Sequence, residues 1–177
     1  PPIPTRKRAS PVRIVTANVN GIRSATSKGF LTWMKRQKAD LVCLQEIKAQ
    51  EADLAREILA PGKFHAFWHP AEKKGYSGVA IYARKEPDRV VLGLGIKDID
   101  AQGRYLQVDY GNLSVVSVYV PSGSSSEEAQ ARKFSFMKRF LPKMKAMKAS
   151  GRVFIVCGDW NIAHKEIDLR NWRSNRK

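Results

Sequence analysis

The sequence is poor in acidic residues, cysteine and histidine, and it contains no long apolar run. Its 177 residues include 16 Asp and Glu, 2 Cys and 3 His. Cys43 and Cys157 each lie in an apolar strand-like run, which indicates buried thiols of a reducing compartment, neither a bridge nor a metal site. No apolar run approaches the roughly 20 residues of a membrane-spanning helix, and no signal-peptide core is visible. We therefore expect a soluble intracellular protein with no membrane partner.

Basic residues are abundant, because 32 Lys and Arg give a formal net charge of +16. A domain this basic usually binds a polyanion, and nucleic acid is the first candidate. The alternative is that the excess belongs to the chain ends, but much of it is spread through the middle. Residues 1–10 contain three prolines and no hydrophobic pattern, which predicts a disordered basic arm. We expect residues 11–177 to form one domain.

Hydrophobic periodicity predicts an α/β fold. Strands are expected at residues 12–19, 41–45, 64–68, 78–83, 89–94, 105–110, 113–120 and 153–157. Helices are expected at 28–37, at 51–59 and after a capping box of Ser125 and Glu128. Pro142 is expected to kink or end that last, long helix. Its apolar face is predicted to be Phe134, Met137, Leu141 and Met144. This order of elements indicates an α/β sandwich rather than a doubly wound sheet.

Polar side chains follow three of these strands at the points where the strands end. Asn18 ends the first, Glu46 follows the second, and Gly158 ends the last strand ahead of Asp159 and Asn161. Ligands and reacting groups collect at the carboxyl rim of α/β sheets, so we expect one shared site. The alternative interpretations are that Asp159 caps a turn, that Glu46 is a solvated strand-end acid and that the asparagines form turns.

Five ordered motifs carry a family likeness. They are Asn18-Val19-Asn20-Gly21-Ile22-Arg23, Gln45-Glu46-Ile47-Lys48, Gly75-Tyr76-Ser77-Gly78-Val79-Ala80, Tyr119-Val120-Pro121 and Gly158-Asp159-Trp160-Asn161-Ile162-Ala163-His164. A sixth stretch, Ile167-Asp168-Leu169-Arg170-Asn171, continues the match. Together they resemble the exonuclease III family of apurinic/apyrimidinic endonucleases, within the endonuclease/exonuclease/phosphatase superfamily.

The resemblance implies a four-layer α/β sandwich, in which two stacked mixed β-sheets are flanked by helices. It implies Mg²⁺-dependent hydrolysis of the DNA backbone on the 5′ side of an abasic site, with Mn²⁺ as an alternative ion. It also implies 3′–5′ exonuclease or 3′-repair activity. The expected partner is double-stranded DNA with abasic sites or 3′-blocked ends, bound by a cytoplasmic or nucleoid-associated monomer.

The resemblance also assigns roles to residues at matching positions. The implied metal-site residues are Asn18, Glu46, Asp159 and Asn161. The implied catalytic residues are Tyr119, Asp159 and Asn161. The implied DNA-binding residues are Arg23, Lys28, Lys48, Tyr76, Arg104 and Asn171. The alternative for Tyr119 is half-buried packing, and each basic residue has the alternative of a solvated surface charge.

The resemblance covers about two-thirds of a family domain of roughly 250 residues. The family's closing Ser-Asp-His motif, which pairs a histidine with the scissile phosphate, is not matched here. We therefore expect the sandwich to be incomplete at its C-terminal end and these residues alone to be inactive. Two other functions stay open: a catalytically inactive basic DNA-binding module, and a superfamily relative acting on inositol phosphates, sphingomyelin or undamaged DNA.

Overall fold

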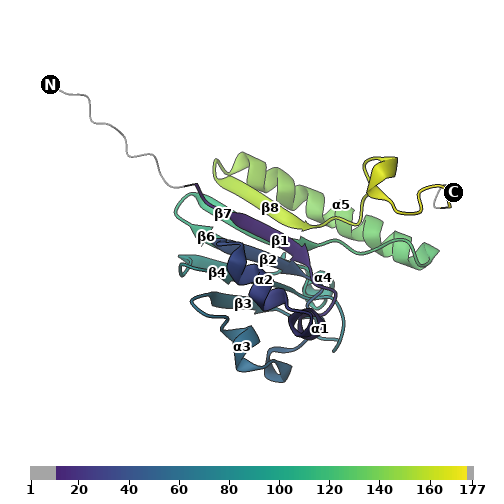
Figure 1. Ribbon diagram of the computed structural model, residues 1–177. Helices are drawn as coiled ribbons and strands as arrows, with labels where there is room; N and C mark the ends of the chain where they lie inside the picture. Colours follow the sequence, from purple (N-terminus) through teal and green to yellow (C-terminus); the bar gives the residue numbers. More distant parts are fainter. Residues whose placement is uncertain (1–10, 175–177) are drawn as a thin grey trace.

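The computed structural model describes residues 11–174, and the predicted arm at residues 1–10 lies outside the described residues. Two four-stranded sheets stack on each other, with helices on their outer faces (Figure 1). The first sheet has the strand order β1 (Ile14–Asn18), β2 (Leu41–Gln45), β4 (Val79–Ala83) and β3 (His65–His69). The second has the order β5 (Arg89–Leu92), β6 (Tyr105–Tyr110), β7 (Leu113–Tyr119) and β8 (Val153–Asp159). Each sheet is mixed, because β1 pairs parallel with β2, β7 pairs parallel with β8, and the other pairs are antiparallel. The predicted four-layer sandwich is confirmed.

Short helices cover the first sheet, and one long helix together with one short helix covers the second. The α-helices are α1 (Ile22–Ser27), α2 (Phe30–Arg36), α3 (Arg56–Leu59), α4 (Lys97–Asp100) and α5 (Glu127–Ala149). Two 3₁₀ turns are η1 (Glu51–Asp53) and η2 (Glu166–Asp168). The predicted helix at 28–37 is wrong in extent, because Gly29 adopts a left-handed conformation (φ 93°) and separates α1 from α2. The helix expected at 51–59 is reduced to η1 and α3.

The long helix differs from its prediction in its cap and its buried face. Ser126 caps α5 by accepting a hydrogen bond from the Ala129 amide at 3.1 Å, so the box expected at Ser125 is one residue too early. Phe134 and Leu141 were expected to be buried but are exposed. The side chains buried against the sheet are Ala129, Phe136, Phe140 and Met147. Pro142 lies inside the helix and does not end it.

Alternation along the strands produces three apolar layers. In β2, Val42 and Leu44 pack under the helices, whereas Leu41 and Cys43 pack between the sheets. A third layer lies between the second sheet and α5. Because β2 and β4 are buried on both faces, their sequences are continuous apolar runs rather than alternating ones.

The edge strands β1 and β8 belong to different sheets and lie side by side (Figure 1). Both edge strands are partly exposed, in contrast to β2 and β4. Gly158 does not end β8 as predicted but lies inside it, because the strand continues to Asp159. A Cβ at Gly158 would overlap the carbonyl oxygen of Val118, so only glycine permits this approach of β8 to β7.

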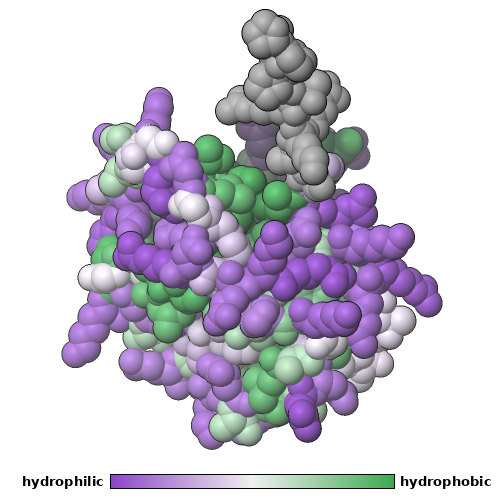
Figure 2. Space-filling model, turned by 90° about the vertical axis from the view of Figure 1, so that its left-hand side faces the viewer, coloured by the Kyte–Doolittle hydropathy of each residue, from purple (hydrophilic) through white to green (hydrophobic). Residues whose placement is uncertain are grey.

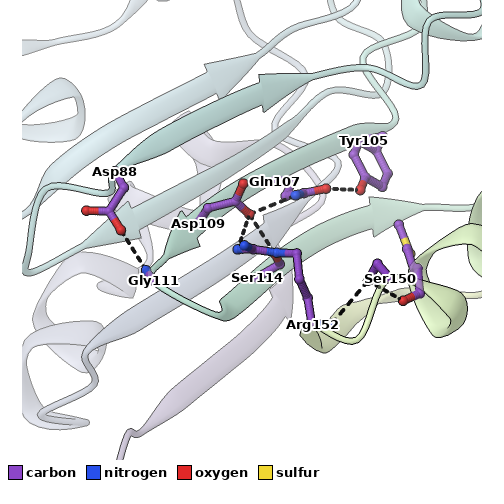
Figure 3. Close-up of polar contacts among 9 residues, drawn as sticks. Asp88, Tyr105, Gln107, Asp109, Gly111, Ser114, Ser150 and Arg152 are labelled. Atoms are coloured by element: carbon purple, nitrogen blue, oxygen red, sulfur yellow. Dashed lines mark hydrogen bonds and ion pairs between the residues drawn. The ribbon is translucent and has the colours of Figure 1, made fainter.

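A buried polar network lies on the second sheet, at the end remote from Asp159. Asp109 Oδ1 accepts hydrogen bonds from Gln107 Nε2 at 2.7 Å and from Ser114 Oγ at 2.6 Å. Arg152 Nη2 lies 3.7 Å from the same oxygen, and Figure 3 shows these four side chains pointing toward one another. Burying a carboxylate is costly unless it is paired and hydrogen-bonded, and this network satisfies that condition.

Hydrophilic side chains cover most of the face drawn in Figure 2, and apolar patches interrupt them. Within residues 11–174, no helix is both long and apolar enough to span a membrane.

Candidate active site

Two hydrogen bonds join the sheets at the carboxyl ends of their strands. Asn18, the last residue of β1, donates from Nδ2 to Asp159 Oδ2 at 2.8 Å. The Tyr119 hydroxyl, at the end of β7, donates to Glu46 Oε1. Since Tyr119 is the register partner of Asp159 on the neighbouring strand, Glu46 and Asp159 lie at one rim. The structure therefore brings together the side chains that sequence reasoning placed in one site.

A lysine ammonium lies between two oxygens of this rim. Lys48 Nζ is 3.2 Å from Glu46 Oε2 and donates to Asn20 Oδ1 at 2.5 Å. The Glu46 side chain is 17% exposed, so solvent screens this attraction only partly. The backbone N–H of Asn20 in turn donates a hydrogen bond to Asn18 Oδ1 at 2.9 Å. Asn20, for which the sequence left a turn interpretation open, thus belongs to a site whose oxygens attract a cation.

Asp159 is held in one orientation by hydrogen bonds to both of its oxygens. Oδ2 accepts a hydrogen bond from the Asn18 side chain, and Oδ1 accepts one from the backbone N–H of Asn161 at 2.9 Å. The Asn161 side chain donates to the Val120 carbonyl at 2.7 Å, and Lys133 Nζ donates to the Asn161 carbonyl at 2.5 Å. Sequence reasoning missed Lys133, because only the docking of α5 places this residue beside the Asn161 loop.

Unusual backbone conformations gather around the same rim. Among the described residues, six non-glycine residues have positive φ. Five of them are site residues or their neighbours: Asn20, Glu46, Lys48, Ser77 and Asn161. A left-handed conformation is uncommon for residues with a side chain and is tolerated where surrounding structure enforces it, often at functional sites. At Glu46 it turns the chain sharply after β2, where the Gly21 amide donates to the Glu46 carbonyl at 2.7 Å.

Arg104 lies between the rings of Tyr76 and Tyr119 and contacts both of them. It is 3% exposed, and it donates from Nη1 to the Tyr119 carbonyl at 3.1 Å and from Nη2 to the Tyr76 hydroxyl at 2.7 Å. Its guanidinium also stacks over both rings, at 5.0 and 5.6 Å from their centroids. Burial lowers the pKa of Arg104. The pKa of Tyr119 is raised by burial, by the hydrogen bond to Glu46 and by the charge of Glu46, so its hydroxyl stays a donor.

Two hollows meet at Asn18. A cleft of about 1010 Å³ is lined by Asn18, Asp159 and Asn161, together with Lys133 and the loop around Ser124. A second hollow of about 550 Å³ runs from Asn18 and Asn20 to Lys28 and the exposed Trp33. A concave surface therefore extends along the rim on both sides of Asn18.

The implied DNA-binding residues fall into two groups. Arg23, Lys28, Tyr76 and Asn171 are exposed, and Lys48 is half-buried beside Glu46. Arg104 differs, because it is buried and its guanidinium nitrogens donate to protein acceptors. DNA contact by any of them stays a prediction, and for Arg104 the geometry favours a positioning role.

The oxygen donors of the rim suit a hard divalent cation. Among residues 11–174, no three His, Cys, Asp and Glu side chains gather into a metal-binding group. The rim instead offers the Glu46 carboxylate and the amide oxygens of Asn18 and Asn20. Mg²⁺ is commonly held by one or two carboxylates, waters and substrate phosphates, and the Lys48 ammonium already lies where Glu46 and Asn20 attract positive charge. The donor set therefore fits, with Lys48 as a competitor that would have to move.

Two stacked mixed sheets carry carboxylate and amide side chains at the carboxyl ends of their strands, and this arrangement indicates an α/β-sandwich hydrolase of the phosphodiesterase type. Residues 15–177 match the family described as Endonuclease/Exonuclease/phosphatase family, and the chain belongs to it.

Comparison with named proteins supports the resemblance to exonuclease III-type nucleases. The chain is 36% identical to an exodeoxyribonuclease of Bacillus subtilis (strain 168), over 93% of this chain and 64% of that protein. It is 34% identical to the DNA repair nuclease APEX1 of Danio rerio, over 96% of this chain and 55% of that protein. The structure of an AP endonuclease from Archaeoglobus fulgidus matches with a TM-score of 0.77 and 28% identity, covering 90% of this chain and 61% of that one. The chain thus spans less than two-thirds of the length of these relatives.

Proposed function

We propose that this site hydrolyses the DNA phosphodiester on the 5′ side of an abasic site, with Mg²⁺ as its ion and Mn²⁺ as an alternative. The observation that carries the proposal is the pair of hydrogen bonds linking Asn18 to Asp159 and Tyr119 to Glu46 across the sheets. These bonds hold two carboxylates at one rim. Asp159 can act as a proton acceptor, and Glu46 can act as a ligand to a cation. Relatives named as an exodeoxyribonuclease and a DNA repair nuclease support the substrate class, and the same site would serve 3′-blocked ends.

Asp159 is the group that we assign to the attacking water. The hydrogen bonds from Asn18 and Asn161 fix its orientation, so it can accept a proton from a water placed in the cleft. General-base assistance of this kind contributes about 10²–10⁴-fold to the rate. We assign Asn161 to holding Asp159 and the loop, because its side-chain amide is engaged by the Val120 carbonyl.

Tyr119 and Glu46 would handle the negative charge of the phosphate. The Tyr119 hydroxyl donates a hydrogen bond to Glu46 in this structure. In the transition state it can donate instead to a non-bridging phosphate oxygen. Glu46, with the amide oxygens of Asn18 and Asn20, would hold the divalent ion, and that ion supplies neutralisation of phosphate charge when bound. Nucleases of this family generally use divalent metal ions, which supports this assignment.

Lysine and arginine residues around the rim would supply affinity without base specificity. Arg23 and Lys28 are exposed beside the hollow that extends from Asn18, and the chain carries a net charge of +16. Contacts to phosphates position a duplex and carry no direct sequence information. That suits a site that recognises a missing base rather than a sequence. We further propose that the protein acts as a monomer in the cytoplasm or nucleoid.

We also propose that residues 11–177 correspond to a nuclease domain without its C-terminal third, and that these residues alone are inactive in turnover, with only slow cleavage left when the protein is in excess over the DNA. The resemblance places a phosphate-contacting histidine in a Ser-Asp-His motif that the 177 residues do not contain. Loss of one charge-stabilising group costs about 10²–10³-fold in rate.

The test is a single-turnover assay with excess protein, Mg²⁺ and a duplex carrying one abasic analogue. We expect a slow nick on the 5′ side of the analogue, little cleavage of the undamaged duplex, and loss of the nick with Asp159→Asn. Binding of the same duplex should survive that substitution. DNA binding with no nick at any protein concentration would instead favour the inactive DNA-binding module, and equal cleavage of undamaged DNA or of an inositol phosphate would refute the abasic-site assignment.

A further inference from the structure

The two cysteines of the chain lie opposite each other between the sheets. Cys43 is on β2 and points toward the second sheet, like Leu41 two residues before it. Cys157 is on β8, and its register partner on β7 is Ser117. Adjacent residues in register point to the same face of a sheet, so Cys157 and Ser117 both face the first sheet.

Hydrogen bonds between β2 and β7, next to the two cysteines, hold the sheets together. Gln45, two residues after Cys43 on the same face of β2, donates from Nε2 to Ser117 Oγ at 2.9 Å. Ser117 Oγ donates to the Leu44 carbonyl at 2.9 Å. Both side chains are buried, so these bonds hold β2 against the second sheet beside the cysteine pair.

The two thiols lie in one apolar cluster between the sheets. Cys157 packs against the buried residues of the cluster that contains Cys43. The neighbouring Cys157 thiol, together with burial, raises the pKa of Cys43 well above its usual value. Cys43 is fully buried, whereas Cys157 lies partly exposed on the edge strand, and both are free thiols. A small oxidant therefore reaches Cys157 first.

We propose that Cys43 and Cys157 are an oxidation site at which a peroxide converts the two thiols into a disulfide that joins β2 to β8. The Cys157 sulfur attacks one peroxide oxygen, the O–O bond breaks, and the first water leaves as Cys157 becomes a sulfenic acid. The Cys43 sulfur then attacks the Cys157 sulfur and the S–O bond breaks. The departing hydroxide takes the proton of the Cys43 thiol and leaves as a second water. Two thiols and one hydrogen peroxide yield one disulfide and two waters, and a dithiol reductant reverses the change.

The disulfide would act on the site through the strands that carry it. Glu46 follows β2 three residues after Cys43, and Asp159 lies two residues after Cys157 on the same face of β8. Non-bonded atoms lie about 3.5–4 Å apart and bonded sulfurs about 2.05 Å apart, so the two sulfurs approach by roughly 1.5–2 Å and draw their strands together. A misplacement of about 1 Å at a catalytic group costs about 10²-fold. This effect on cleavage rests on the proposed function, whereas disulfide formation does not.

The experiment oxidises the 177-residue chain with equimolar hydrogen peroxide and measures intact mass and free thiols after denaturation. We expect a monomer that has lost two hydrogen atoms, no alkylatable thiol, and return of both thiols with dithiothreitol. The matched variants Cys43→Ser and Cys157→Ser, each checked by circular dichroism, should not lose the two hydrogens. Cys43→Ala is a second variant should the buried hydroxyl impair folding.

Several results would overturn the proposal. Oxygen addition to Cys157 while Cys43 still alkylates, disulfide-linked dimers, or no reaction at all would each refute the intramolecular bond. In the reduced chain, nicking measures the proposed function by itself. If the reduced chain nicks and the disulfide form nicks at least 10-fold more slowly, the strand coupling holds. An equal rate in both forms refutes the coupling.

Discussion

Arg104 allows a sharp test of whether a basic residue in this site binds DNA or positions other side chains. The test substitution is Arg104→Met, which keeps an unbranched apolar stem, is shorter than arginine, and removes the charge and the donors. In the structure the guanidinium is 3% exposed and donates to the Tyr119 carbonyl, the Tyr76 hydroxyl and Gln102 Oε1. A phosphate contact would require these bonds to be exchanged.

The expected cost to stability follows from those bonds. Hydrogen bonds to charged groups contribute about 1.5–3 kcal/mol each, but of the three acceptor residues only Tyr119 is buried, whereas Tyr76 is exposed and Gln102 is half-buried. Burial lowers the pKa of Arg104, so its charge is desolvated, and methionine removes that penalty. The two effects oppose each other, and we expect a net loss of roughly 2 kcal/mol in the free energy of unfolding.

The assay measures urea unfolding and the salt dependence of duplex binding. Each phosphate contact contributes about 0.9 to the slope of log K against log salt concentration. We expect Arg104→Met to leave this slope unchanged and to slow nicking by about 10-fold or more, because Tyr119 loses its support. The matched control Lys28→Met, at an exposed position, should lower the slope by about 0.9 and leave stability unchanged.

The positioning argument is refuted by one combination of results. If Arg104→Met unfolds like the parent chain while its salt slope falls by about 0.9, Arg104 contacts a phosphate and the sequence-based assignment was right.

Three further predictions concern Tyr119, Tyr82 and Asp109. Tyr119→Phe keeps the ring but removes the donor to Glu46, so single-turnover cleavage should slow by about 10²-fold with little change in duplex affinity; an unchanged rate would exclude phosphate contact by Tyr119. Burial raises the pKa of Tyr82 above its ordinary value of 10.0, so its contribution to stability is present below pH 10 and is lost as pH rises further; urea midpoints measured between pH 8 and 11 should fall, and a flat profile would contradict this. Asp109→Ala leaves the buried donors of its network without their acceptor and should cost about 2–4 kcal/mol in urea unfolding; a cost below about 1 kcal/mol would show that the network relaxes.

The sequence predicted the sheets better than the helices. Strands β2 and β6 were predicted with the bounds that the structure has. In β2 the signal is a short, largely apolar run, and in β6 it is an apolar/polar alternation between two tyrosines. The face of α5 was misassigned because Phe134 and Leu141 are apolar but point away from the sheet. Only the docking of the helix selects Phe136 and Phe140 for burial, since a helix with apolar residues on several sides has no single predicted face.

What the sequence by itself determined is the identity of the rim: polar residues at the ends of β1, β2 and β8, and motifs in a fixed order. What only the tertiary structure decided is how those residues are engaged, including Lys48 between Glu46 and Asn20, Arg104 beneath Tyr119, and Cys43 against Cys157. Each of these contacts joins residues that are distant in the chain or separated by a turn. Local patterns fix which side chains leave a strand end, but packing of one sheet on the other fixes what they meet.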